Sequence, residues 1–183
     1  MLLVAGGVTI AIGVTTLAVA RARPDLSLAA ASGDAQVVFL LAGWLVAAAG
    51  LVKLAEEQRS LGTLLVVAGC AWFAAELDSP AARPAALFTA GLVVAAAAPA
   101  VLAHAALALA RPRGWRALAG AGYRVAVGVL GVVVAAVFDP VAEGCADCPA
   151  NLLRIATDPG VHADVERWGF RLAGALYAAA NAR

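Results

Sequence analysis

Charged residues are scarce in this chain of 183 residues. Asp, Glu, Lys and Arg together make up 14% of it, whereas hydrophobic residues make up 63% and the mean hydropathy is +0.90. An ordinary soluble domain is roughly one-quarter charged. A chain of this length cannot bury so much apolar surface in a single globular core, so the composition excludes one soluble domain and predicts a protein embedded in the lipid bilayer.

The sequence also lacks the motifs that mark soluble active sites. It contains no G-x-S-x-G, no P-loop and no H-E-x-x-H. A glycine-rich ATP-binding segment and a phosphoacceptor histidine followed by an acidic residue are missing as well. The net charge is +1, and no basic stretch is interleaved with aromatic residues. We therefore predict no catalytic residue, no cofactor, no metal and no nucleic-acid partner for this chain.

The chain consists largely of apolar runs of about 20 residues, and a helix of this length crosses ~30 Å of hydrocarbon. The predicted fold class is all-α: a polytopic transmembrane helical bundle that forms a single integral membrane domain over residues 1–183. The sequence ends while a sixth, shorter segment is still apolar, so we expect the chain to be the front part of a longer protein. The five predicted full spans are about 2–20, 36–54, 61–77, 85–110 and 118–137, and the sixth, truncated or partial helix is predicted at 165–183.

The first apolar run has an alternative interpretation as a signal peptide, because Ala18-Val19-Ala20 resembles a cleavage site. However, it has no basic segment before the apolar run, and that run exceeds the roughly 7–15 residues usual in signal peptides. We interpret it as a retained first helix.

The positions of lysine and arginine favour one orientation, because short cytoplasmic loops carry an excess of them. If the amino terminus is cytoplasmic, the loop 138–160 lies outside the cytoplasm. This loop contains Cys145 and Cys148. Disulfides persist on that oxidising side of a membrane. With this orientation the inner loops hold Lys53, Arg59, Arg111, Arg113 and Arg116, and the outer loops hold Arg21, Arg23, Arg83 and Arg154.

Cys145 and Cys148 form a Cys-x-x-Cys pair in the acidic loop after the fifth span. The pair is predicted to be a disulfide that staples the loop, although such pairs also occur as redox centres. A zinc site is a third interpretation, with His162 and Asp147 as partners, but the motif supplies too few ligands. Cys70 lies in the middle of the third span, where a free cysteine behaves as a small apolar residue.

Other candidate functional residues lie inside a span or at its outer end. His104 is the ionisable residue well inside a span, and such residues are functional candidates, although packing is the alternative. Four carboxylates could form an acidic outer rim that meets a cation or a basic peptide, or could be solvated helix ends; they are Glu76, Asp78, Asp139 and Glu143. Small residues repeated every four positions, such as Gly43 and Ala47, favour close helix packing.

An ordered series of short phrases gives the chain a resemblance to one family. It resembles the multi-pass amino-terminal regions of certain bacterial two-component sensor histidine kinases, over nearly its whole length. The phrases are Ala42-Gly43-Trp44, Ala49-Gly50-Leu51, Ala71-Trp72-Phe73, Phe88-Thr89-Ala90-Gly91-Leu92, Ala103-His104-Ala105, Phe138-Asp139-Pro140 and Cys145-x-x-Cys148-Pro149-x-Asn151-Leu152.

The resemblance implies a six-helix sensor (input) domain whose last helix leads into a cytoplasmic dimerisation and ATP-binding kinase. That catalytic half is absent from this chain, so ATP, Mg²⁺, a response regulator as partner and a homodimer belong only to a parent protein. Two other functions remain open at this point. One is a membrane thiol-disulfide oxidoreductase that uses Cys145 and Cys148, and the other is a small multi-pass transporter or assembly subunit.

Overall fold

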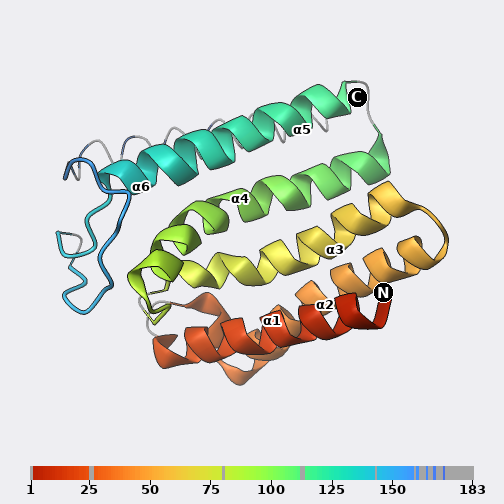
Figure 1. Ribbon diagram of the computed structural model, residues 1–183, viewed down its shortest axis with the longest axis horizontal. Helices are drawn as coiled ribbons and strands as arrows, with labels where there is room; N and C mark the ends of the chain where they lie inside the picture. Colours follow the sequence, from red (N-terminus) through yellow and green to blue (C-terminus); the bar gives the residue numbers. More distant parts are fainter. Residues whose placement is uncertain are drawn as a thin grey trace.

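In a computed structural model, the described residues are 2–24, 27–79, 81–111, 114–142 and 144–158, together with positions 160, 164, 167 and 171. The described part is helical and contains no strand, and its long helices run side by side (Figure 1). The elements are α1 (Leu2–Ala22), η2 (Leu28–Ala30), α2 (Gly33–Ala55), α3 (Arg59–Ala74), η3 (Ala75–Asp78), α4 (Ala85–Ala110), α5 (Trp115–Tyr123), the π-helical η4 (Arg124–Val133) and α6 (Val134–Val137).

The prediction of an all-helical chain with five membrane-length helices is confirmed. Within the residues that the structure describes, five helices are long and apolar enough to cross a membrane, with mean hydropathies between 1.6 and 2.2. The third continues from α3 through η3 as Arg59–Asp78, and the fifth joins α5, η4 and α6 into Trp115–Val137. The predicted sixth helix at 165–183 lies outside the described residues, except for the single positions 167 and 171.

The connections fall at two opposite ends of the bundle. Those after α1, α3 and α6 lie at one end, and those after α2 and α4 lie at the other (Figure 1). We call the first the Cys-loop end, because residues 138–158 form its largest connection. Ser32 caps α2 at this end, where its hydroxyl accepts a hydrogen bond from Ala35 N at 3.1 Å.

Helices α2 and α3 approach each other closely, through glycines on both helices. A methyl group added at Gly69 would lie 2.7 Å from the carbonyl oxygen of Gly43 and 2.9 Å from the backbone nitrogen of Ala47. One added at Gly50 would lie 2.8 Å from the carbonyl oxygen of Gly62. These distances leave no room for a side chain, so the two backbones touch directly.

Phe73 fills the centre of the cluster that joins α1 to this pair. Its side chain has no exposed surface, and its ring lies 5.3 Å from the ring of Phe39 in an edge-to-face arrangement. A methyl group at Gly13 of α1 would come within 2.9 Å of the Phe73 ring, so this glycine lets α1 approach. Trp44 packs against the same ring from α2.

Large apolar side chains point away from the bundle along its length. The first two helices expose Leu3, Val14, Val38 and Leu45, with Leu3 92% exposed. In water such a surface would be unfavourable, whereas in lipid it matches the surrounding chains. The outward faces therefore agree with the membrane-length helices in indicating a bilayer environment.

The glycine contacts between α2 and α3 yield a test of the packing. Gly69→Ala should destabilise the bundle by about 1–3 kcal/mol, because the added methyl group forces two backbones apart. Gly7→Ala is the matched control, since nothing lies within 4 Å of a methyl group at Gly7. Thermal unfolding of the purified protein in detergent measures both variants. Equal midpoints for the two would contradict the close approach of α2 and α3.

Candidate functional site

The loop after α6 is closed by a disulfide. Cys145 and Cys148 are bonded, with their Cα atoms 5.4 Å apart. Gly144 precedes the first cysteine with a φ of 90°, a left-handed conformation that glycine adopts without strain. The backbone nitrogen of Cys145 donates to the carbonyl oxygen of Pro140 at 2.8 Å, which closes the turn. The predicted disulfide is therefore present.

Asn151 fastens the far side of this loop to the end of the fifth span. It is buried, and its Nδ2 donates to the carbonyl oxygens of Ala135 at 2.6 Å and Phe138 at 2.9 Å. Its Oδ1 accepts from Leu153 N at 3.0 Å. The last carbonyls of a helix have no partner within the helix. Asn151 thus satisfies groups at the end of α6 that water would otherwise have to bind.

Backbone groups of the loop add two further attachments. Ile155 N donates to the carbonyl oxygen of Ala136 at 2.8 Å, which satisfies another carbonyl of α6. Leu152 N donates to the hydroxyl of Thr89 at 2.9 Å, and Thr89 is a buried residue of α4. The loop is therefore bonded to two membrane-length helices.

Asp139 organises the two ends of the loop. Its carboxylate accepts hydrogen bonds from Val141 N at 3.0 Å and from the Thr157 hydroxyl at 3.1 Å, and it pairs with Arg154. Desolvation acts to raise the pKa of Asp139, but these hydrogen bonds, that of Ala142 N and the charge of Arg154 lower it below its usual value. The carboxylate is therefore ionised at neutral pH and bridges residues 139–142 to residues 154–157.

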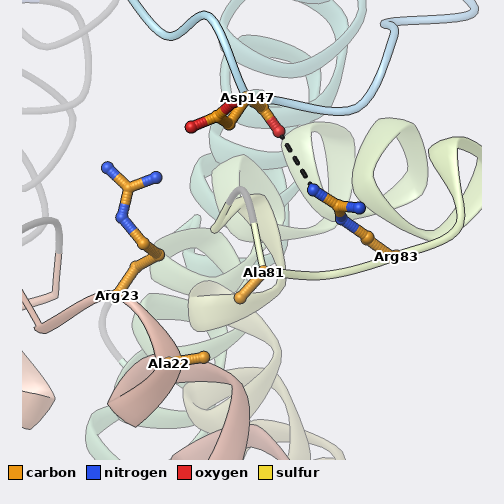
Figure 2. Close-up of a pocket in the computed structure, with 5 residues that line it drawn as sticks. All are labelled: Ala22, Arg23, Ala81, Arg83 and Asp147. Carbon is orange, nitrogen blue, oxygen red and sulfur yellow. Dashed lines mark hydrogen bonds between the residues drawn. The ribbon is translucent and has the colours of Figure 1, made fainter.

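A small pocket lies where the loop meets the other connections at this end. Its volume is about 280 Å³, and it is lined by Ala22, Arg23, Ala81, Arg83 and Asp147. Figure 2 shows the Arg83 guanidinium directed at the backbone carbonyl of Asp147, with an Nη2–O distance of 3.4 Å. The pocket thus brings together the end of α1, the connection between α3 and α4, and the disulfide ring.

Two carboxylates of the predicted acidic rim have separate local partners. Glu76 accepts a hydrogen bond from the Ser27 hydroxyl at 2.7 Å and lies near Asp78 in η3. Asp139 belongs instead to the loop, and Glu143 lies outside the described residues. Within the described part of the chain, no three His, Cys, Asp or Glu side chains are grouped so as to hold a metal ion. His162, the other residue weighed for zinc, also lies outside it.

His104 packs from α4 against α5, near the end of the bundle opposite the loop. Its Nδ1 lies 3.1 Å from the Tyr123 hydroxyl, and its ring lies 5.8 Å from the ring of Trp115. Arg116 in turn lies over the Trp115 ring at 5.3 Å. The position of His104 inside a span singles it out in the sequence, whereas its aromatic partners on α5 carry no such signal. Their contacts give His104 a role in joining α4 to α5.

Cys70 is the free cysteine, and it is remote from the disulfide in the fold. Its sulfur lies 3.9 Å from the Thr9 hydroxyl, so it contributes to the contact between α3 and α1. Thr9 also donates to the carbonyl oxygen of Ala5 at 2.9 Å.

No protein-family model matches the chain, and no curated protein or solved structure matches it. The residues themselves must therefore support any functional proposal.

The attachments of the loop predict how it responds to loss of the disulfide. The double variant Cys145→Ser/Cys148→Ser should insert and fold, because the bond encloses only a few residues and so contributes at or below the low end of ~2–4 kcal/mol. Asn151, Thr89 and Asp139 still hold the loop in this variant. Limited proteolysis of the protein in detergent should show faster cleavage within 138–158 and an unchanged helical core. Failure of the variant to fold would contradict a modest contribution.

Proposed function

We propose that the chain is the membrane-embedded input domain of a bacterial two-component sensor histidine kinase. In this proposal the kinase, its ATP and Mg²⁺ and its response regulator belong to the rest of a longer, homodimeric protein. The chain itself contributes reception of a stimulus and its transmission through the bilayer.

The observation that carries the proposal is the attachment of the disulfide-closed loop to the membrane helices. Asn151 binds the carbonyls that end α6, and Leu152 binds Thr89 of α4. A ligand or force that displaces the loop must therefore alter the ends of two spans. A binding event outside a membrane can be transmitted only if it favours one helix arrangement over another, and these bonds supply such a connection.

A thiol-disulfide oxidoreductase receives less support from the geometry. Such an enzyme needs a second thiol pair or a partner to pass electrons on. Cys70 packs against Thr9 of α1, whereas the disulfide follows α6, which contacts α4 and η4. The two sites therefore lie on different helix pairs.

A transporter also receives less support from the polar groups inside the bundle. Among the described residues, no charged side chain is buried. The buried Thr9 and Thr16 direct their hydroxyls to carbonyls of their own helix, at 2.9 Å for each. Hydroxyls bonded in this way do not offer a row of binding groups to a polar solute.

The proposal includes a cytoplasmic amino terminus and an extracytoplasmic loop at 138–160, as the disulfide favours. In intact cells, a membrane-impermeant maleimide should label Cys145 and Cys148, but only after treatment with an impermeant reductant. The variant Cys145→Ser/Cys148→Ser retains Cys70 and is the unlabelled control. Labelling that requires opened cells would show instead that the loop is cytoplasmic, and the proposed orientation would be wrong.

The coupling of loop to kinase is testable in the parent protein. Asn151→Ala leaves carbonyls of α6 unpaired, so it should change the autophosphorylation rate about fivefold or more, the lower range of allosteric coupling. Ala150→Ser, at an exposed neighbouring position, is the control and should leave the rate unchanged. Rates are measured with radiolabelled ATP on full-length protein in nanodiscs. A reading frame without a kinase after Arg183, or equal rates for both variants, would reject the proposal.

A further inference from the structure

We infer that the turn at residues 151–155 of the loop lies in the surface of the lipid bilayer. Its three apolar side chains, Leu152, Leu153 and Ile155, contact the acyl chains of the leaflet at the Cys-loop end. The partner of this turn is therefore a lipid surface. The inference goes beyond the proposed function, because it rests on the position of the turn whether or not a kinase follows the chain.

The first observation is the depth at which the turn is held. Ile155 N donates to the carbonyl oxygen of Ala136 at 2.8 Å, and Ala136 lies in the last turn of the fifth span. Leu152 N donates to the hydroxyl of Thr89 at 2.9 Å. Thr89 lies about one helical turn, roughly 6 Å, inside α4 from its first residue. The backbone of the turn is therefore level with residues inside two spans.

The second observation is the chemistry of the turn. Arg154 N donates to the carbonyl oxygen of Asn151 at 3.4 Å, so Leu152 and Leu153 occupy the corner between them. Corners of turns in water favour Gly, Pro, Asn, Asp and Ser. Here the two leucines are 63% and 43% exposed, and Ile155 after them is 87% exposed. Three large apolar side chains exposed together are unfavourable in water but match the acyl chains of a bilayer.

The third observation is that the turn pairs its own backbone donors. Each backbone N–H from position 152 to position 156 donates within the protein. The acceptors are the Thr89 hydroxyl, the side chain and carbonyl of Asn151, and the carbonyl oxygen of Ala136, which accepts twice. A loop in water needs no such pairing, because water accepts these bonds, whereas a segment in lipid must be paired internally. The N–H groups of the turn are thus suited to a medium poor in hydrogen-bond acceptors.

Arg154 indicates the level at which the polar region begins. It stands between Leu153 and Ile155 in the sequence, yet its guanidinium pairs with Asp139, just beyond the end of the fifth span. Its side chain is 45% exposed. An arginine at the edge of lipid lays its methylene stem along the apolar region and directs its charged head toward the headgroups. The ion pair therefore lies at headgroup level, and the apolar side chains lie on the lipid side of it.

Within the proposed function, and only there, this contact has a consequence for signalling. A change in the packing of that leaflet that moves the turn also acts on Ala136 and Thr89, through the hydrogen bonds that hold it. The stimulus would then be the state of the membrane rather than a soluble ligand.

Spin-label accessibility measures where the turn lies. Cys70→Ala removes the free thiol, and the intact disulfide does not react, so Ile155→Cys then provides a single labelling site. The labelled 183-residue protein is placed in phosphatidylcholine nanodiscs. Collisions of the label with oxygen, which concentrates in lipid, are compared with collisions with a nickel complex that stays in water. The label at position 155 should retain the oxygen collisions and lose nearly all collisions with the nickel complex.

Two reference positions set the scale of this measurement. Leu45→Cys, at an exposed position inside the second span, gives the lipid value. Ala142→Cys, at an exposed position of the same loop and next to Glu143 in the sequence, gives the water value. Leu153→Cys is a second site on the turn, so misfolding of one labelled variant leaves the other informative. Size exclusion and thermal unfolding confirm that each variant is folded.

Two results would overturn the inference. One is frequent collision with the nickel complex at positions 153 and 155, as at position 142, which would place the turn in water. The other is a low collision rate with both reagents, which would show that protein covers the turn. Neither result depends on kinase activity, so failure of the lipid contact and failure of the proposed function are distinguishable.

Discussion

The contact between the backbones of α2 and α3 is the interaction on which the bundle depends. Lipid chains are as apolar as leucine, so burial of apolar surface does not draw helices together inside a bilayer. Close packing must supply the attraction instead, and it requires residues without bulk. Gly43 and Gly50 on α2 meet Gly62 and Gly69 on α3. This pair forms the platform on which Phe73 is enclosed, and α1 then closes over the same ring at Gly13.

A second constraint acts at the Cys-loop end, where the fifth span ends at Val137. Carbonyls at the end of a helix need donors, and residues near a membrane surface cannot rely on water for all of them. The loop supplies donors from Asn151 and from the backbone of Ile155 to carbonyls of Ala135, Ala136 and Phe138. The loop therefore provides the hydrogen-bond donors that a further turn of the helix would otherwise provide. The disulfide shapes its tip, whereas the polar bonds to α6 and α4 fix its place.

Composition and run length were sufficient to predict the five spans, because both follow directly from the thickness of the bilayer. The boundaries of the first, second, third and fifth spans moved by a few residues, since residues such as Arg59 and Trp115 still form helix beyond the apolar runs. Gly43 and Ala47 were expected to pack, and both are buried. Gly62 and Gly69 were not singled out, because a small residue on an alanine-rich helix gives no signal of which neighbour it meets.

The site was less predictable, because it depends on pairs distant in sequence. The Cys-x-x-Cys spacing is local and predicted the disulfide. The bonds from Asn151 to the end of α6 and from Leu152 to Thr89 join residues separated by 13 to 63 positions. Likewise, Arg23, Arg83 and Asp147 each looked like an ordinary charge at a helix end, and only the fold brings them to one pocket. The charges that line this pocket come from separate connections of the bundle rather than from a motif in one of them. These charged residues come together only when the helices next to them have packed, and that packing depends on the glycines of α2 and α3.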